Sequence, residues 1–222
     1  MENLSVKNNL EKIQKNIEKI CLKKNLQKQK VTLVGISKQQ AIEKIKEAYD
    51  VGLRHFGENK AQEFLQKYEL LPKNIIWHFV GHLQKNKVKS IIDKVSFIHS
   101  LDSLPLALEI EKRASSIHKK IKCFIQINMG GETTKSGIDE KDLPKMVSEI
   151  KKLSHVDLIG LMCLPPYCEN KEEVRPYFRN LKKLGKQFHL EHFSGGMSHD
   201  YEIAIEEGAT FIRVGSHLFG KR

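Results

Sequence analysis

The sequence alternates eight times between a short apolar segment and a stretch whose apolar residues recur at helical spacing. The apolar segments are rich in β-branched and aromatic residues, which is typical of buried strands. Parallel strands need a long crossover connection, and a helix usually supplies it. We therefore expect an α/β fold, a single (β/α)8 barrel of the TIM type over residues 1–222. The expected strands lie at 31–38, 53–59, 75–82, 95–100, 121–128, 158–162, 192–194 and 211–214.

The segment before the first strand predicts an additional helix. Residues 4–28 carry Leu10, Ile13, Ile17 and Ile20 at three- and four-residue spacing, which is typical of an amphipathic helix that packs across the barrel. An open doubly wound sheet is the alternative architecture, but no Gly-x-Gly-x-x-Gly motif follows the first expected strand.

The charge of the chain raises the question of a nucleic-acid partner. The 222 residues carry a formal net charge of +11, so a basic RNA-associated protein is one alternative. The lysines, however, stand beside glutamates along the expected helices, as in 43–47 and 109–113, which is typical of a solvated helix face. We expect no specific nucleic-acid binding.

Cysteine usage and hydropathy indicate the compartment. The cysteines, Cys21, Cys123, Cys163 and Cys168, form no Cys-x-x-Cys pair, and two of them lie in apolar strand-like runs. This usage is typical of reduced thiols in the cytosol rather than of disulfides or a zinc site. No apolar run reaches membrane-spanning length, and the first residues lack the apolar region of a signal peptide. We expect a soluble cytoplasmic protein without membrane association.

A lysine ends the first expected strand. Lys38 follows the apolar run 31–37 and precedes a helical pattern at 39–48. In a parallel barrel, chemistry collects at this carboxyl end of the strands. A partly desolvated amine at such a position can be neutral and form a Schiff base with an aldehyde. The alternative is a lysine with a buried stem and a solvated head.

The loops after the seventh and eighth strands are the richest in glycine and serine. Residues 195–198 precede one helical pattern, and 215–216 precede another. Barrels commonly bind a phosphate at these loops, where glycines let the backbone approach and hydroxyl and amide groups donate hydrogen bonds. Ser198 and Ser216 therefore predict a phosphate site, with ordinary helix N-caps as the alternative.

Arg213 lies in the eighth strand, on the face that it shares with Phe211. A buried arginine needs an acid or a ligand atom as its partner. It would donate a hydrogen bond to a pyridine nitrogen and leave that nitrogen unprotonated, and a carboxylate on a neighbouring strand would serve it equally. An aldehyde-binding lysine, a phosphate site and a pyridine-nitrogen partner together describe pyridoxal 5′-phosphate (PLP).

Motifs along nearly the whole chain resemble those of the pyridoxal phosphate homeostasis protein family, single-domain relatives of the alanine racemase barrel. The matching segments are 34–38, 55–59 with 62–63, 77–87, 131–137, 160–162, 196–198 with Asp200, and 213–220. This resemblance implies that PLP is held covalently at Lys38. The cofactor-binding residues that it implies are Lys38, Asn59, Met197, Ser198, Arg213, Gly215 and Ser216.

The resemblance also assigns roles within this set. It implies that Ser198, Gly215 and Ser216 hold the phosphate, that Arg213 faces the ring nitrogen, and that the His82 loop lines the pocket beside Asn59. Two residues depart from the family pattern: Gly195 stands where the family often has methionine, and His199 where it often has aspartate. Both flank the phosphate loop, so the departures affect only the detail of the pocket.

The resemblance implies a protein of intracellular PLP homeostasis that holds PLP without a dedicated reaction, with PLP-dependent apoenzymes as its recipients. The alternative is a PLP-dependent amino-acid racemase. A two-base racemase needs a second acid/base group opposite the lysine, which relatives take from a C-terminal domain. The sequence ends at Arg222, directly after the eighth repeat, so we expect the carrier and no catalytic residue.

Two other patterns keep separate alternatives open. Histidines near strand ends would suit a metal-dependent hydrolase, and they are His55, His78, His82, His99, His189 and His192. No His-x-His pair ends the first strand and no acidic ligand stands at a known metal spacing, so we expect no metal. Residues 133–137, which include Lys135, are either a mobile flap or a plain turn.

Overall fold

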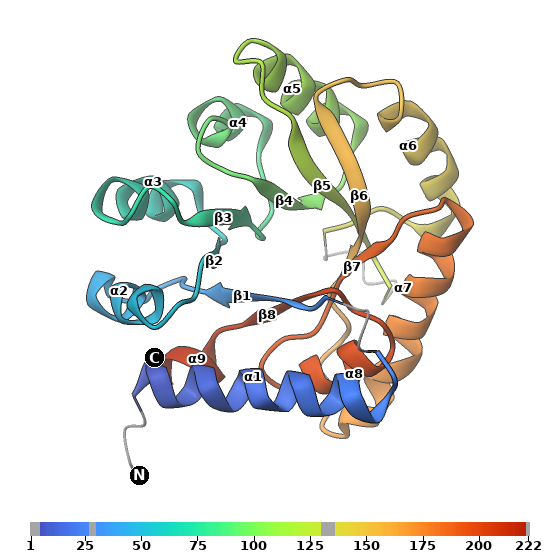
Figure 1. Ribbon diagram of the computed structural model, residues 1–222. Coiled ribbons are helices and arrows are strands. Elements are labelled where there is room, and N and C mark those ends of the chain that lie inside the picture. Colours follow the sequence, from blue (N-terminus) through green and yellow to red (C-terminus); the bar gives the residue numbers. More distant parts are fainter. Residues whose placement is uncertain (1–4, 27–29, 130–135, 221–222) are drawn as a thin grey trace.

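Eight parallel strands close into one barrel, each paired with the next along the chain and the last paired with the first (Figure 1). The structure, a computed structural model, describes residues 5–26, 30–129 and 136–220. The strands are Thr32–Ile36 (β1), His55–Glu58 (β2), Ile76–Phe79 (β3), Phe97–Leu101 (β4), Ile121–Ile127 (β5), Val156–Cys163 (β6), His192–Ser194 (β7) and Phe211–Val214 (β8). The predicted (β/α)8 barrel is confirmed, with every expected strand in place.

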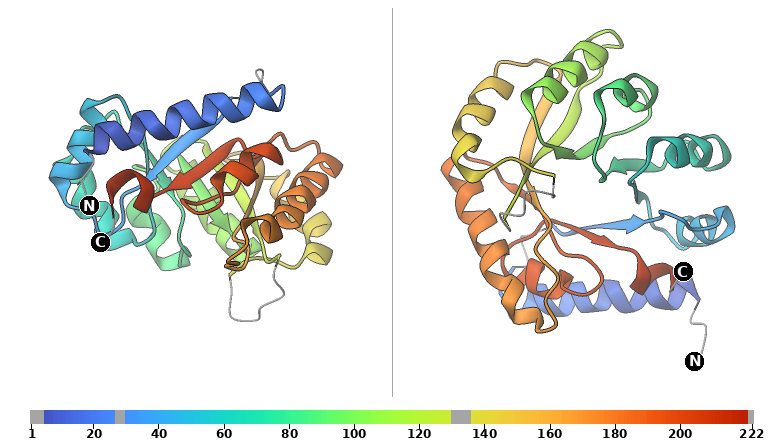
Figure 2. Two further views of the ribbon diagram at one scale, coloured as in Figure 1. Left: turned by 90° about the horizontal axis from the view of Figure 1, so that it is seen from below. Right: turned by 180° about the vertical axis from the view of Figure 1, so that it is seen from behind.

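Helices surround this barrel on the outside (Figure 2). The α-helices are Val6–Lys23 (α1), Ile42–Asp50 (α2), Ala61–Leu70 (α3), Lys85–Ile91 (α4), Leu104–Ser115 (α5), Leu143–Ile150 (α6), Arg175–Gln187 (α7), Tyr201–Glu206 (α8) and Ser216–Phe219 (α9). Two short 3-10 helices, Glu140–Asp142 (η1) and Lys171–Val174 (η2), precede α6 and α7. Across the described ranges, no helix is long and apolar enough to cross a lipid bilayer.

The additional helix α1 packs on the barrel as predicted but is shorter than the expected 4–28. It begins after Ser5, whose hydroxyl accepts a hydrogen bond from the Asn8 N–H, and ends at Lys23. The chain leaves the helix because Asn25 takes a left-handed conformation with φ of 54°. α1 lies against α8 and α9 in Figures 1 and 2, and the Asn16 amide donates to the Tyr201 hydroxyl at 2.9 Å.

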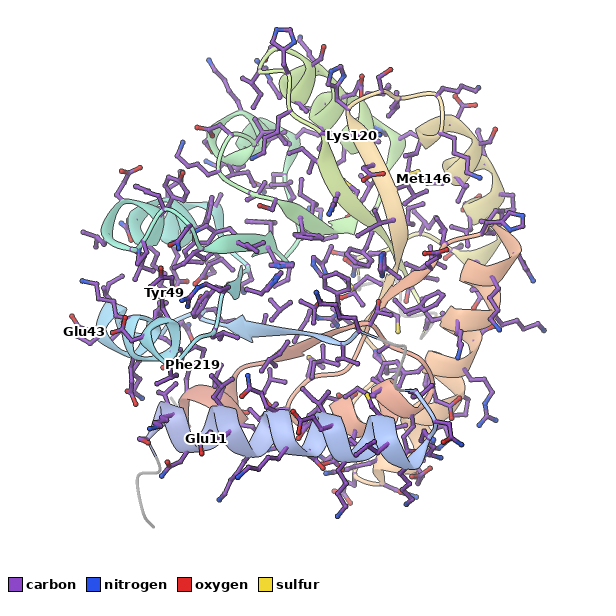
Figure 3. All side chains as sticks on the ribbon, viewed as in Figure 1. Glu11, Glu43, Tyr49, Lys120, Met146 and Phe219 are labelled. Atoms are coloured by element: carbon purple, nitrogen blue, oxygen red, sulfur yellow. The ribbon has the colours of Figure 1, made fainter. Side chains whose placement is uncertain are left out.

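Strand alternation divides the apolar side chains between two cores. The larger core fills the space between the strands and the helices, and a smaller one fills the interior of the barrel (Figure 3). The buried members of the smaller core are Val34, Ile36, Phe97, Phe124, Met162 and Phe211. Ile212 and Val214 belong to the outer core, so Phe211 and Arg213 face the interior, as the sequence predicts.

Candidate functional site

Lys38 lies in a tight turn directly after β1, and its side chain is half-buried. The Gln40 N–H donates to the Ser37 carbonyl at 3.0 Å, and Gln39 has a left-handed φ of 59°. A left-handed residue other than glycine is uncommon, so the surrounding structure has to hold this turn.

The buried Lys67 stabilises the turn that contains Lys38. The Lys67 ammonium donates to the Ser37 carbonyl at 2.6 Å, to Glu58 Oε1 at 2.7 Å and to Glu63 Oε1 at 2.6 Å. The Ser37 hydroxyl donates to the same Glu58 oxygen at 2.7 Å, and the Gln39 N–H donates to Glu63 Oε1. We call Lys67, Glu58 and Glu63 the Lys67 cluster. It fixes both neighbours of Lys38.

The two carboxylates of the Lys67 cluster differ in their environment. Glu58 is fully buried, and burial raises the pKa of its carboxyl although hydrogen bonds from Lys67 and Ser37 work in the opposite direction. Partial burial would also raise the pKa of Glu63, but hydrogen bonds from Lys67 and from the Gln39 N–H bring it below its usual range. Glu58 therefore depends on Lys67 for its charged form.

The loops after β7 and β8 converge on one hydroxyl. Ser198 Oγ accepts hydrogen bonds from the Gly215 N–H and the His217 N–H, each at 3.3 Å. Ser216 lies between these two amides and is exposed. A Cβ atom at Gly215 would lie 3.4 Å from the Ile36 carbonyl, so this loop packs directly on the strand that leads to Lys38. The sequence-predicted phosphate residues and Lys38 thus share one end of the β1–β8 pair.

The loop that carries Ser198 has its own internal support. Asp200 is buried, and its Oδ1 accepts the Met197 N–H at 2.6 Å. Gly196 has φ of 86°, and a Cβ atom there would lie 2.6 Å from the Cβ of Ala204 on α8. Met197 is 41% exposed, so its backbone rather than its side chain is fixed in this loop.

Arg213 lies inside the barrel and is 4% exposed. Its Nη2 donates to the Cys163 carbonyl at 3.0 Å, and its Nη1 donates to the Ser194 hydroxyl. Burial lowers the pKa of the guanidinium, which nevertheless stays protonated. Among the residues that the structure describes, no carboxylate forms an ion pair with Arg213. The alternative that a carboxylate on a neighbouring strand pairs with Arg213 is therefore not supported there.

Asn59 and the His82 loop meet on the other side of Lys38. A Cβ atom at Gly81 would lie 2.3 Å from the Asn59 carbonyl, so only glycine allows this close approach. His82 is exposed and its Nδ1 lies 3.0 Å from Asp102 Oδ2. A cavity of about 190 Å³ opens beside His82 among the loops after β3, β5 and β6. Lys135 and its neighbours 133–134 lie outside the described residues.

Comparison with known proteins decides which family this site belongs to. Residues 8–222 match the family described as alanine racemase, N-terminal domain. The pyridoxal phosphate homeostasis protein of Aquifex aeolicus is 47% identical over 220 residues, covering 96% of this chain and 95% of that protein. This chain belongs to the pyridoxal phosphate homeostasis protein family. The resemblance inferred from the motifs is therefore confirmed.

Solved structures agree with this assignment to the pyridoxal phosphate homeostasis family. PipY of Synechococcus elongatus, solved with PLP bound, is 34% identical with a TM-score of 0.80, covering 86% of this chain and 92% of that chain. An alanine racemase from Clostridium difficile shares the barrel fold at 19% identity and a TM-score of 0.72, covering 98% of this chain and 60% of that chain.

The two departures from the family pattern have local explanations. A Cβ atom at Gly195 would lie 2.8 Å from the Phe178 ring, so Phe178 of α7 occupies the space that a larger residue would need. His199 Nε2 lies 3.2 Å from the Cys168 carbonyl and links the β7 loop to the β6 loop. Neither residue displaces Ser198.

The metal-dependent hydrolase would need several ligand side chains close together in the described parts of the chain. There, no three His, Cys, Asp or Glu side chains are placed to hold a metal ion. His189 and His192 lie before or at the start of β7, at the opposite end of the barrel from Lys38. All four cysteines are free thiols, and burial raises the pKa of Cys163 to about 12.

We predict that Lys67→Met destabilises the protein by ~3–5 kcal/mol near pH 8, because it leaves Glu58 charged, buried and without its cation. The folded-state pKa of Glu58 is already raised, so the proton bound there favours folding at low pH and this contribution is lost as pH rises. Urea-unfolding curves should therefore show a smaller loss of unfolding free energy for Lys67→Met at pH 5 than at pH 8.

Two variants control this experiment. Lys73→Met removes an exposed partner of Glu69 and should change stability by about 1 kcal/mol or less. Adding Glu58→Gln to Lys67→Met should recover part of the loss, because it removes the unpaired charge. A loss no larger than that of Lys73→Met, or one independent of pH, would contradict the role given to the Lys67 cluster.

Proposed function

We propose that this protein binds PLP covalently at Lys38 in the cytoplasm and holds it for PLP-dependent apoenzymes without a dedicated turnover reaction. One observation carries the proposal: Arg213, a buried cation without a carboxylate partner among the described residues, lies on the strand beside the one that leads to Lys38. The PLP-bound PipY relative supports the choice of ligand. The proposed binding residues are Lys38, Asn59, Met197, Ser198, Arg213, Gly215 and Ser216.

The loops after β7 and β8 fit a phosphate. The Gly215 and His217 amides already point at one oxygen, Ser198 Oγ, and both bonds are long at 3.3 Å. Two amide donors aimed at a single oxygen suit an anion, since charge-assisted hydrogen bonds are shorter and stronger than neutral ones. The exposed Ser216 hydroxyl adds a third donor at the same loop.

Lys38 supplies the covalent link. Its primary amine can condense with an aldehyde and release one water, provided that the amine is neutral and correctly placed. The Lys67 cluster places it, because the residues before and after Lys38 are both hydrogen-bonded to that cluster. When bound, PLP contributes an aldehyde and a pyridine ring that withdraws electrons.

Arg213 favours storage over catalysis. A guanidinium only donates hydrogen bonds, so a pyridine nitrogen opposite it stays unprotonated. An unprotonated ring withdraws electrons weakly, which limits the rate of amino-acid chemistry. For this reason we propose no catalytic residue. Because the lysines stand beside glutamates on solvated helix faces, we also propose no specific nucleic-acid partner.

The first test concerns Lys38. Borohydride reduction of protein incubated with PLP should attach one phosphopyridoxyl group to the peptide that contains Lys38, as read by mass spectrometry. Lys38→Ala should abolish this label, and Lys46→Ala, which removes an exposed lysine of α2, should leave it intact. Labelling that survives Lys38→Ala would refute the covalent assignment.

The second test concerns the phosphate loops. Ser216→Asp should weaken PLP binding by roughly tenfold or more, because a carboxylate then faces the phosphate dianion at short range. Pyridoxal, which lacks the phosphate, should bind as it does to the wild type. Ser116→Asp places the same charge at the distant end of α5 and serves as the control. Equal losses for both ligands would mean that the loop is only structural.

The match to the alanine racemase N-terminal domain keeps racemase activity as a second candidate. We expect negligible exchange of the α-proton of alanine and other amino acids in deuterated water, measured by NMR beside Lys38→Ala. We expect holo protein to restore activity to a PLP-dependent apoenzyme. Lys38-dependent exchange at about one turnover per second or faster, which is ordinary for enzymes, would favour the racemase.

A further inference from the structure

A line of hydrogen bonds crosses the interior of the barrel and ends at Arg213. His55 Nδ1 lies 2.9 Å from His78 Nε2, and His78 Nδ1 lies 2.8 Å from His99 Nε2. His99 Nδ1 then lies 2.7 Å from Ser194 Oγ, which accepts from Arg213 Nη1. We call His55, His78, His99 and Ser194 the histidine ladder. It runs through β2, β3, β4 and β7 to β8.

The donors and acceptors of the histidine ladder allow one fully satisfied arrangement. Arg213 can only donate, so Ser194 Oγ accepts from it. If His99 also donated to Ser194, the buried Ser194 O–H would have no acceptor among the described residues. Ser194 therefore donates to His99 Nδ1, His99 Nε2–H donates to His78, and His78 Nε2–H donates to His55.

The surroundings keep the histidine ladder uncharged. Burial lowers the pKa of His78 and of His99 well below the usual value for histidine, and the charge of Arg213 lowers the pKa of His99 further. Their rings are stacked on Phe97 and Phe124, with ring centroids 4.3 and 4.4 Å apart respectively. Each ring is therefore confined by an aromatic neighbour.

The partially buried His55 has the same tendency. Burial lowers its pKa, and the positive charges of Lys30 and Lys122 lower it further. In this arrangement each acceptor lone pair of the ladder points toward Arg213. A row of neutral dipoles aligned in this way stabilises a cation without neutralising it.

We propose that the histidine ladder positions the Arg213 side chain, a role that a carboxylate partner would otherwise have. It fixes one edge of the guanidinium through Ser194, keeps the full positive charge, and leaves unused N–H groups for a ligand acceptor. An arginine has five N–H donors, and among the described residues Ser194 Oγ and the Cys163 carbonyl occupy two of them. The assignment of that acceptor as the PLP ring nitrogen rests on the function proposed above.

The first experiment needs no PLP. Long-range ¹H–¹⁵N NMR spectra of the PLP-free protein at pH 7.5 distinguish the two neutral tautomers of each histidine. We expect the Nε2–H tautomer at His55, His78 and His99. An Nδ1–H tautomer at His99, or a protonated ring at His78 or His99, would overturn the ladder whether or not PLP binds.

The second experiment reads the effect on bound PLP labelled with ¹⁵N at its ring nitrogen. His99→Phe keeps a ring but removes the acceptor for Ser194, so the ¹⁵N signal should shift and affinities for PLP and pyridoxal should fall by a similar factor, about fivefold or more. His99→Asn restores an acceptor near the Nδ1 position and should recover the wild-type signal. His192→Phe is the matched control, because His192 faces the same interior but contacts Thr210 and Phe211.

The outcomes separate the two proposals. An unchanged ring-nitrogen signal in His99→Phe would refute the positioning role while leaving PLP binding in place. Wild-type protein that fails to bind PLP would refute the proposed function and this role with it, while the tautomers still decide the direction of the ladder. Should His99→Phe not fold, Ser194→Ala removes the acceptor for Arg213 and should give the same shift.

Discussion

Charge inside a low-dielectric interior has to be compensated, and two buried cations, Lys67 and Arg213, organise this barrel around that requirement. Lys67 lies outside the strands and is compensated by the carboxylates of Glu58 and Glu63. Arg213 lies inside the strands and is compensated by a hydroxyl and a carbonyl. The two cations stand on either side of β1, the strand that leads to Lys38.

Lys67 and Arg213 have different partners, and this explains why we assign them different roles. Lys67 makes short bonds to two carboxylates and to the Ser37 carbonyl, so its ammonium is fully used by the protein and serves to fix the turn. Among the described residues Arg213 has no carboxylate partner and uses two of its five donors, which is why we propose that it receives a ligand acceptor. In the function that we propose, the rigid turn places the Lys38 amine and the remaining Arg213 donors receive the ring nitrogen.

Much of this arrangement is predictable from the sequence because it is local. The alternation of apolar and helical segments gives the eight strands, and strand alternation alone places Arg213 on the interior face with Phe211. The loops of Ser198 and Ser216 follow from their position after the seventh and eighth strands. The family resemblance rests on motifs of the same local kind, and the comparisons confirm it.

The parts that the sequence does not reveal depend on contacts between distant residues. Glu63 and Lys67 stand four apart on α3, which is the usual spacing of a surface ion pair, so only the fold shows that Lys67 reaches Ser37 and Glu58. His99 and Ser194 are 95 residues apart and meet only when the barrel closes. The predicted end of α1 is wrong because apolar spacing does not reveal that Asn25 takes a left-handed conformation, and the helix ends at Lys23.

A crystal structure of the protein grown with PLP tests our proposal that the ends of four strands, β1, β2, β7 and β8, converge on one ligand. We expect continuous density from Lys38 Nζ to the ring, the phosphate at Ser198, Gly215 and Ser216, and the ring nitrogen within hydrogen-bond distance of Arg213. PLP attached to a different lysine, or a ring nitrogen that faces a carboxylate instead of Arg213, would contradict it.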